Sequence, residues 1–478
     1  MTVARSDATG RGELDPDVLE FTSSLPVDRA LYAADIAGSL AHVRMLEECQ
    51  IIPREDAVAI RRGLEGIFED ASSGKMNWPP EEDIHMAIEV ELGKRIGEAA
   101  ERLHTARSRN DQIALDGRLH LRERAAEILE QIARLLQVLV RKAEGPEGQF
   151  LMPVYTHRQR AQPARVGYLL SAYGQMAARD AGQFAQVLNG IDECPLGVGA
   201  VSGTSLPIRR ERTAELLGFS RTTANGLDTV GDRDFAVDFV YAGARTLIHL
   251  SRISQDVVDF SSEEFGWIEL DDRISFGSSM MPHKRNPDLF ELIRGKSARA
   301  IGALTALLTN LKGVPVGYMR DLQEDKVSYL EVATLTSACL VAMTRGLEGL
   351  RFREARLSEG LANGFTQATD LAERLVMRGV PFRAAYRAVG ALVRAARAAG
   401  KSLHQVGPEE LKDTGITAAD LRYLSASNAV EAKGTPGSTG PDAIADQLAA
   451  LKEAIAGAEA RAKATPRLAE LVARMVAS

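Results

Sequence analysis

The stretch KVSYLEVATLTSACLVAMTRGLEGL, residues 326 to 350, decides the fold of this chain. Apolar and small side chains stand on nearly every side of a helix drawn through it, so other parts of the protein must cover most of its surface. We expect this helix to run from about 324 to 350. Its composition predicts a central rod in a bundle of helices.

Four other long segments show the same helical period. Apolar residues recur mostly at three- and four-residue steps across 113–143, and similar patterns cover about 164–189, 233–262 and 287–312. At about 1.5 Å per residue, these helices are roughly 35–45 Å long. One subunit can hardly bury five such rods, so we expect an all-α bundle that associates with copies of itself. Strand signals are few, and short hairpins are expected only near 196–208.

The bulk composition excludes several classes of function. Of the 478 residues, 45% are hydrophobic and 26% charged, which is typical of a soluble globular protein of two to four domains. The net charge of −7 gives no indication of a nucleic-acid or membrane partner. Three distant cysteines predict neither a disulfide framework nor a zinc site, and a reducing cytoplasm fits best. No apolar run is expected to reach membrane length.

The positions of the long helical patterns and of the Gly/Pro stretches predict three domains. Residues 1–107 form an N-terminal helical domain, 108–361 a central domain of long helices, and 362–478 a C-terminal helical domain in which Gly/Pro stretches return. No internal repeat or low-complexity tract is present.

Residues 275 to 288, SFGSSMMPHKRNPD, predict a binding loop. Gly277 opens a flexible turn with two serines, and the prolines at 282 and 287 keep the segment out of regular structure. Lys284, Arg285 and Asn286 are anion donors. This order suits a loop that closes over a carboxylate and brings a hydroxyl to it. The alternative is an ordinary surface loop, which would account for the solvated charges but not for this particular order of residues.

Three further stretches carry polar residues at helix ends. HTARSRNDQ (104–112) precedes the first long helix and forms either an anion site at its positive end or a plain cap. YMRDLQEDK (318–326) stands at the start of the apolar helix. Its polar residues are either candidates for a functional site or only a charged first turn of that helix. In MPVYTHRQRAQPA (152–164), His157 is a candidate proton shuttle, although a lone histidine is more often structural.

Two other kinds of site are excluded from the residues. The glycines of LGVGAVSGTSLP (196–207) lack the lysine and the flanking pattern of a phosphate-binding loop. The eight histidines form no H-x-x-x-H pair and no cluster with carboxylates at ligand spacing, so no metal is expected.

The loop at 277–287 resembles the GSSxMPxKxNP signature of the fumarase/aspartase superfamily, whose members cleave a C–N or C–O bond and release fumarate. Five further stretches resemble its argininosuccinate lyase branch, and the likeness extends from about 23 to 441: SRNDQ (108–112), YTHRQRAQP (155–163), GTSLPIRR (203–210), DRDF (232–235) and RDLQEDK (320–326). The resemblance implies an all-α, three-domain fold, a homotetramer with a central helix bundle, and active sites that each draw on three subunits.

The resemblance also implies the reaction and the residues that perform it. Argininosuccinate would be cleaved reversibly, through a carbanion stage, to arginine and fumarate, the last step of arginine biosynthesis, with no cofactor. Ser278 corresponds to the base, His157 to the general acid with Glu291 as its carboxylate partner, and Lys284 and Asn286 to the carboxylate-binding pair. Residues matching the substrate-binding positions are Ser24, Ser108, Arg109, Asn110, Thr156, Arg233, Tyr318, Gln323 and Lys326, of which the last three would hold the arginine end.

Two alternatives remain open at this stage. A sister lyase would release a different amine from a substituted succinate, and a crystallin-like relative would keep the fold without catalysis. The chain departs from the usual family residues at Val154, Arg158, His283, Tyr386 and Ser438, and none of these departures removes a proposed catalytic group.

Overall fold

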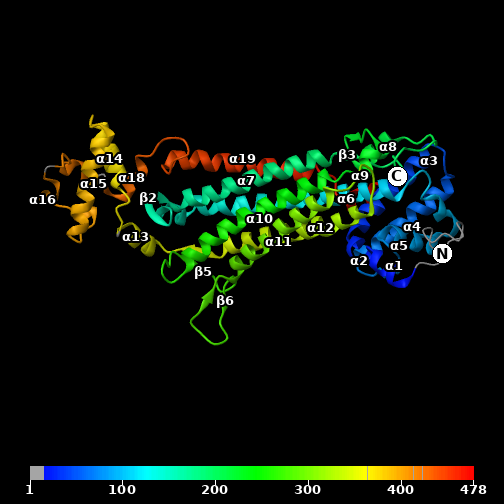
Figure 1. Cartoon of the computed structure of the whole chain (residues 1–478), viewed down its shortest axis with the longest axis horizontal. Helices are drawn as coiled ribbons and strands as arrows, with labels where there is room; N and C mark the ends of the chain where they lie inside the picture. The colour runs from blue at the N-terminus through cyan, green and yellow to red at the C-terminus, as the bar shows by residue number, and fades with distance from the viewer. Residues whose placement is uncertain (1–14, 363, 413, 422–423, 478) are drawn as a thin grey trace.

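The computed structural model describes residues 15–362, 364–412, 414–421 and 424–477, and the fold is helical, as predicted. Long helices lie side by side in an elongated bundle, with shorter helices gathered at its two ends (Figure 1). The five expected long helices are confirmed within a few residues: α6 (Arg109–Glu144), α7 (Val166–Ile191), α10 (Asp234–Ser261), α11 (Asp288–Leu311) and α12 (Asp325–Glu348).

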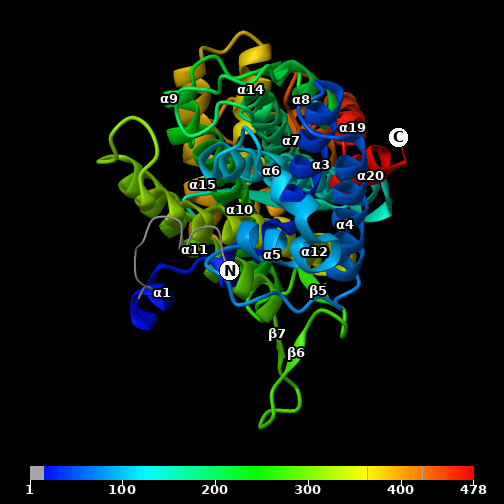
Figure 2. The same cartoon turned by 90° about the vertical axis from the view of Figure 1, so that its right-hand side faces the viewer.

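Short N-terminal helices cap one end of the bundle (Figure 2). They are α1 (Pro16–Thr22), α2 (Leu25–Asp28), η2 (Arg29–Leu31), α3 (Tyr32–Glu48), α4 (Arg54–Ser72), α5 (Ile84–Ile96) and η3 (Gly97–Arg102). Three later elements lie at the same end: α8 (Arg210–Leu217), α9 (Gly226–Gly231) and η5 (Arg320–Glu324). The start of α6 is therefore surrounded by segments from distant parts of the sequence.

The C-terminal part of the chain packs in two different places. A small body at the far end of the bundle has its own core around Leu371, Val389 and Leu392. It contains α14 (Ala368–Met377), α15 (Phe382–Ala398), η6 (Leu403–Gln405), α16 (Pro408–Leu411) and α17 (Ala418–Leu421), with α13 (Glu354–Ala362) and α18 (Ala426–Glu431) connecting it to the bundle. The chain then returns, since α19 (Pro441–Ala464) packs on α6 and α7 and α20 (Leu468–Val476) packs on α3.

The predicted domain boundaries at 107/108 and 361/362 stay predictions. Residues 1–14 of the predicted first domain, and 363, 413, 422–423 and 478 of the predicted third, lie outside the described residues.

The strands of the described residues form four small two-stranded sheets. They are the antiparallel pairs β1 (Leu151–Thr156) with β2 (Gln159–Arg165), β5 (Ile268–Leu270) with β8 (Leu350–Phe352), and β6 (Phe276–Gly277) with β7 (Arg285–Asn286), and the parallel pair β3 (Glu193–Cys194) with β4 (Arg221–Thr222). The expected hairpin near 196–208 is wrong, because that segment is a series of irregular turns. Its glycines at 197, 199 and 203 have positive φ, which breaks the extended backbone that a strand requires.

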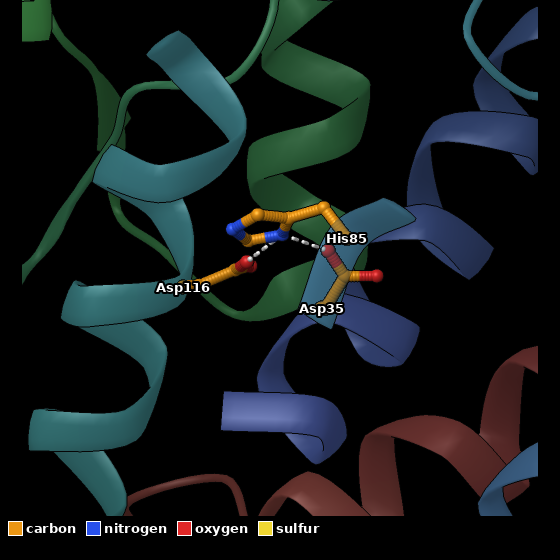
Figure 3. Close-up of side chains that lie close together, drawn as sticks. All are labelled: Asp35, His85 and Asp116. Carbon is orange, nitrogen blue, oxygen red and sulfur yellow. Dashed lines mark hydrogen bonds and ion pairs between the residues drawn. The ribbon is translucent and has the colours of Figure 1, made fainter. Parts of the chain in front are cut away.

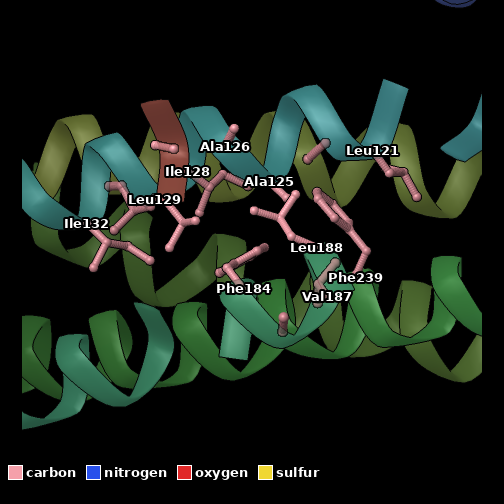
Figure 4. Packing of buried hydrophobic residues seen from close by; sticks show 14 of the residues in the cluster. Leu121, Ala125, Ala126, Ile128, Leu129, Ile132, Phe184, Val187, Leu188 and Phe239 are labelled. Carbon is pink, nitrogen blue, oxygen red and sulfur yellow. The ribbon is translucent and has the colours of Figure 1, made fainter. Parts of the chain in front are cut away.

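One continuous hydrophobic core runs along the bundle and into the N-terminal helices. Figure 4 shows its middle, where Leu121, Ile128 and Ile132 of α6 face Phe184 of α7 and Phe239 of α10. The Phe184 and Phe239 rings pack edge to face with their centroids 5.7 Å apart. Both side chains are fully buried, so they tie three rods together at one level.

The helix α12 confirms the expected central rod, with an uncovered strip. It packs against α6, α10 and α11, yet Val327 and Val341 remain 46% and 47% exposed. The expectation that no apolar run reaches membrane length is wrong here, since the helical residues 320–348 are long and apolar enough to cross a membrane. Half of the apolar window is buried inside the protein, and we therefore assign this helix to the bundle core.

Replacing Phe184 with Ala should lower the free energy of unfolding by about 3–5 kcal/mol, because it leaves a cavity between three helices. Urea unfolding followed by circular dichroism measures the change. The matched control is Phe21→Ala, since the Phe21 ring is 89% exposed. Equal shifts for both variants would contradict this account of the core.

Candidate functional site

The predicted substrate-binding residues near the start of α6 are held by a capping box. Ser108 is the N-cap, its Oγ accepts from the Asn110 N–H at 3.3 Å, and the Asp111 carboxylate accepts from the Ser108 N–H at 3.0 Å. The Asn110 side-chain amide donates to the carbonyl oxygen of Ala200 at 3.1 Å. The segment 108–110 therefore presents donors at the positive end of a 36-residue helix.

Asp111 connects this helix start to the glycine-rich loop. Its second carboxylate oxygen accepts from the backbone N–H groups of Gly197 and Gly199 at 2.9 and 2.8 Å. Burial raises the pKa of Asp111, and the three backbone hydrogen bonds oppose that shift. The glycine-rich loop, which lacks the pattern of a nucleotide site, thus binds the Asp111 carboxylate and holds the start of α6 beside the candidate site.

Other predicted binding residues lie around the same end of the bundle. Ser24 donates to the buried Asp28, which also accepts from the Ile84 N–H at 3.1 Å. Arg109 pairs with Asp83 at 2.5 Å, and the Gln323 amide donates to the Thr22 carbonyl oxygen at 3.1 Å. These bonds connect α2 with α5, α5 with α6, and η5 with the end of α1.

Arg233, Tyr318 and Lys326 complete this first group. Arg233 forms a buried ion pair with Asp325, and Gly231 and Gly317 approach so closely that a Cβ on Gly231 would lie 2.6 Å from the Gly317 oxygen. Burial raises the pKa of Tyr318 although Arg233 and Arg320 lie nearby, so its hydroxyl stays a neutral donor. Lys326 is 2% exposed, and the structure gives its ammonium no hydrogen bond or ion pair among the residues it describes.

Thr156 and His157 form a second group at the opposite end of the bundle, on the β1–β2 hairpin (Figure 1). His157 and Arg158 occupy the two-residue turn, with φ of 50° and 56°. The Arg158 guanidinium pairs with Asp259 at 2.7 Å, near the C-terminal end of α10. His157 is exposed at the tip of the turn.

Ser278, Lys284, Asn286 and Glu291 form a third group around the β6–β7 hairpin, which projects from the bundle (Figure 2). The Ser278 Oγ accepts from the backbone N–H groups of Met280 and Met281 at 3.3 and 3.0 Å. The loop is open to solvent. At its base, a polar cleft of about 1040 Å³ is lined by Lys284, Asn286 and Glu291 but not by Ser278 or His157.

The length of the helices separates these groups within one chain. Arg233 immediately precedes α10 and Asp259 lies close to its end, so at about 1.5 Å per residue the first and second groups are roughly 40 Å apart. The Asn310 amide, at the end of α11, donates to the Asp321 carbonyl oxygen at 2.8 Å, whereas Glu291 lies in the first turn of that helix, roughly 30 Å away. Within one chain, the second and third groups thus lie far from the first, and both stand near the C-terminal end of α10.

A buried charge cluster that the sequence pattern did not predict lies behind the first group. His85 of α5 lies between Asp35 of α3 and Asp116 of α6 (Figure 3). The expectation that no histidine clusters with carboxylates is therefore wrong, because these residues meet only in the fold. The His85 Nδ1 lies 2.6 Å from Asp35, which is a hydrogen bond that leaves no room for an ion between them. We assign the group as an ion pair network.

Comparison with known proteins identifies the relatives of this chain. A family model described as Lyase matches residues 10–302, and one described as Argininosuccinate lyase C-terminal matches 365–431. The argininosuccinate lyases of Moorella thermoacetica and Pelotomaculum thermopropionicum are each 44% identical, over 93% and 92% of this chain and 96% of each relative. Among solved structures, an EDDS lyase in complex with formate superposes with a TM-score of 0.83 at 26% identity, covering 98% of both chains. A fumarate lyase from Mesorhizobium (TM-score 0.71, 18% identity, 94% and 99% covered) shares the fold.

Replacing Asp111 with Ala should destabilise the 197–200 loop, because three backbone N–H groups lose their acceptor. We expect a loss of about 2–4 kcal/mol in unfolding free energy and faster hydrogen exchange at Gly197 and Gly199. Asp228→Ala, which removes an exposed carboxylate of α9, is the control. Unchanged exchange at both glycines would refute the proposed link.

Proposed function

The chain belongs to the argininosuccinate lyase family, and we propose that it cleaves argininosuccinate reversibly to arginine and fumarate. The observation that carries this proposal is 44% identity to curated argininosuccinate lyases over 93% of the chain. Such an enzyme catalyses the last step of arginine biosynthesis, and we place it in the cytoplasm. Its three cysteines are free thiols, which suits a reducing compartment.

The elimination requires a base, an acid and a site for a carboxylate. A proton leaves the carbon next to a carboxylate, and the bond from the neighbouring carbon to the guanidino nitrogen of arginine then breaks. Negative charge accumulates on that carboxylate in the carbanion stage, so cations and amide donors must already be in place. Lys284 and Asn286 supply an ammonium and an amide at the base of the β6–β7 loop.

Ser278 is our candidate base, with His157 as the acid. Serine is a weak base unless its alkoxide is stabilised. The two backbone N–H groups that donate to Ser278 Oγ would stabilise negative charge on that oxygen. His157, exposed at its hairpin tip, would protonate the departing nitrogen, and Glu291 would orient the imidazole.

The first group of residues would hold the remainder of the substrate. The Lys326 side chain is 2% exposed and its ammonium has no partner among the described residues, so this cation can bind an anion. A substrate carboxylate at the arginine end would supply that anion, with Tyr318 and Gln323 as hydrogen-bond donors. The succinate portion would be bound near the start of α6 by Asn110, Ser108, Arg109 and Ser24. Arg233 would complete the lining there, and Thr156 would reach the site with the second group.

We propose that three chains of a homotetramer complete each site. Supporting this, apolar side chains on the outer faces of α10, α11 and α12 are uncovered in one chain: Tyr241, Ile248, Leu292, Ile301, Leu308, Val327 and Val341. Bundles that associate through these faces in opposite directions bring the hairpin end of one chain to the α6 start of another. That arrangement removes the separation of about 40 Å.

A sister lyase remains the second candidate, because the EDDS lyase structure superposes over nearly the whole chain. Its 26% identity is well below the 44% shared with argininosuccinate lyases. Fumarate absorbance with purified enzyme and a panel of N-substituted aspartates, argininosuccinate included, tests both. Fumarate release from another member at a higher kcat/KM than from argininosuccinate would replace our proposal, and absence of release from every member would favour a crystallin-like protein.

Ser278→Ala should leave a folded oligomer whose kcat is lowered by roughly 10²–10⁴-fold, because the base is lost. The Ser278 side chain is only half-buried, so loss of its hydroxyl should change stability little. Ser279→Ala, in the same turn, is the matched control and should retain most of the activity. If Ser278→Ala keeps a third of the wild-type kcat with normal mass and circular dichroism, the assignment of the base is wrong.

Mixing inactive His157→Asn and Ser278→Ala chains should restore part of the activity. When His157 and Ser278 of one site come from different chains, random tetramers contain some sites that receive neither defect. The two variants are unfolded together, refolded and assayed for fumarate release, with each variant refolded alone as the control. Mixed tetramers of the correct mass that stay inactive would mean that one chain supplies both residues, or that one of them is misassigned.

A further inference from the structure

The cluster of Asp35, His85 and Asp116 has no direct part in the proposed chemistry, yet it lies directly behind the first group of binding residues. Its members come from α3, α5 and α6, and all three side chains are buried (Figure 3). Asp83, which pairs with Arg109, is the N-cap of α5 and stands two residues before His85. Asp116 is two turns along α6 from Arg109.

The two carboxylates of the cluster, Asp35 and Asp116, differ in their hydrogen bonding. The Nδ1 of His85 carries one proton and donates it to Asp35 at 2.6 Å, and Gln112 donates to the same Asp35 oxygen. Asp116 contacts the same ring nitrogen at 3.2 Å as an ion pair, but neither of its buried oxygens has a hydrogen-bond partner. Asp116 is therefore the member on which the fold can hold an extra proton.

We propose that Asp116 sets the charge behind the segment 108–110, so that its proton strengthens the binding of anionic substrate there without Asp116 touching the substrate. This inference rests on the proposed function for its substrate. With the proton bound, the cluster and the neighbouring Arg107 carry a net positive charge. Loss of the proton adds a negative charge roughly 10 Å behind an anion site.

The electrostatic surroundings agree with this role. Burial and the nearby Asp35 charge raise the pKa of Asp116 to about 7. Burial alone would lower the pKa of His85, but Asp116 and Asp35 raise it to about 10, so the imidazolium persists at neutral pH. The charged and titratable groups that act on the cluster from outside are Asp83 of α5, Arg107 before α6 and Tyr329 of α12. His42 of α3 lies next to Arg107, and Asp325 of α12 lies next to Tyr329.

The affinity for substrate should change with pH in one direction. As the pH rises through 7, Asp116 loses its proton, and the added negative charge opposes the carboxylates of the substrate. The KM for argininosuccinate should therefore rise roughly threefold to tenfold between pH 6 and 8.5, by the Coulomb energy of a charge at this distance. In Asp116→Asn, which stays neutral, the KM should remain low and change less than about twofold, with kcat close to that of wild type.

Kinetics of three proteins across this pH range test the proposal. Glu127→Gln makes the same carboxylate-to-amide change on α6, about 27 Å from Arg109, and should keep the wild-type pH dependence. An Asp116→Asn variant whose KM rises with pH as in wild type would overturn the proposal. A purely structural role would lower Tm or kcat and leave that pH dependence in place.

Two measurements keep the test open if Asp116→Asn does not fold. Infrared spectroscopy of the wild-type protein should show a protonated carboxyl band that disappears as the pH rises through neutrality, and absence of such a band at pH 6 would refute the proposal. Calorimetry with succinate should show the same loss of affinity with pH. Succinate binding without argininosuccinate cleavage would refute the proposed function alone, because the pH dependence of binding would remain.

Discussion

The length of the bundle helices is the constraint on which the rest of the structure depends. Apolar faces along α6, α7, α10, α11 and α12 must be buried, and the helices satisfy this by lying side by side over their full length. A helix of 36 residues is about 54 Å long, so segments attached to its two ends cannot meet. The same rigidity that stabilises the core therefore keeps the candidate binding residues near the start of α6 far from the candidate catalytic residues at the hairpin end.

Charged side chains determine how the binding end is built. Arg118 pairs with Asp232, Arg233 pairs with Asp325, and His85 bridges two carboxylates, all at the junction of the bundle with the N-terminal helices. An unpaired charge at such a depth would be very unfavourable, so each pair fixes the relative position of the helices that contribute it. The hydrogen-bond donors of segment 108–110 are consequently attached to helices whose relative positions are fixed.

The sequence predicted the rods well, because apolar residues at helical spacing leave few alternatives. The β1–β2 hairpin was not predicted, since its turn uses His157 and Arg158 at positive φ instead of the Asn and Gly that favour such turns. The Asp35–His85–Asp116 cluster was also missed, because its members are distant in sequence and their spacing carries no signal. Roles for Ser278, His157 and Lys326 came from family resemblance, and the residue pattern alone could not assign them.

The two ends of the molecule differ in rigidity, and this difference has a functional meaning under the proposed assembly. The binding end is crosslinked by ion pairs within one chain, whereas His157 stands at the exposed tip of the β1–β2 hairpin and Ser278 stands on the β6–β7 loop, which is open to solvent. A lone chain would hold the binding residues in place but offer the reactive groups only to solvent. Under this proposal each hairpin would gain its counterpart from another chain, so catalysis would begin with assembly. The exposed apolar faces of α10, α11 and α12 would then drive association and also control when the reaction can occur.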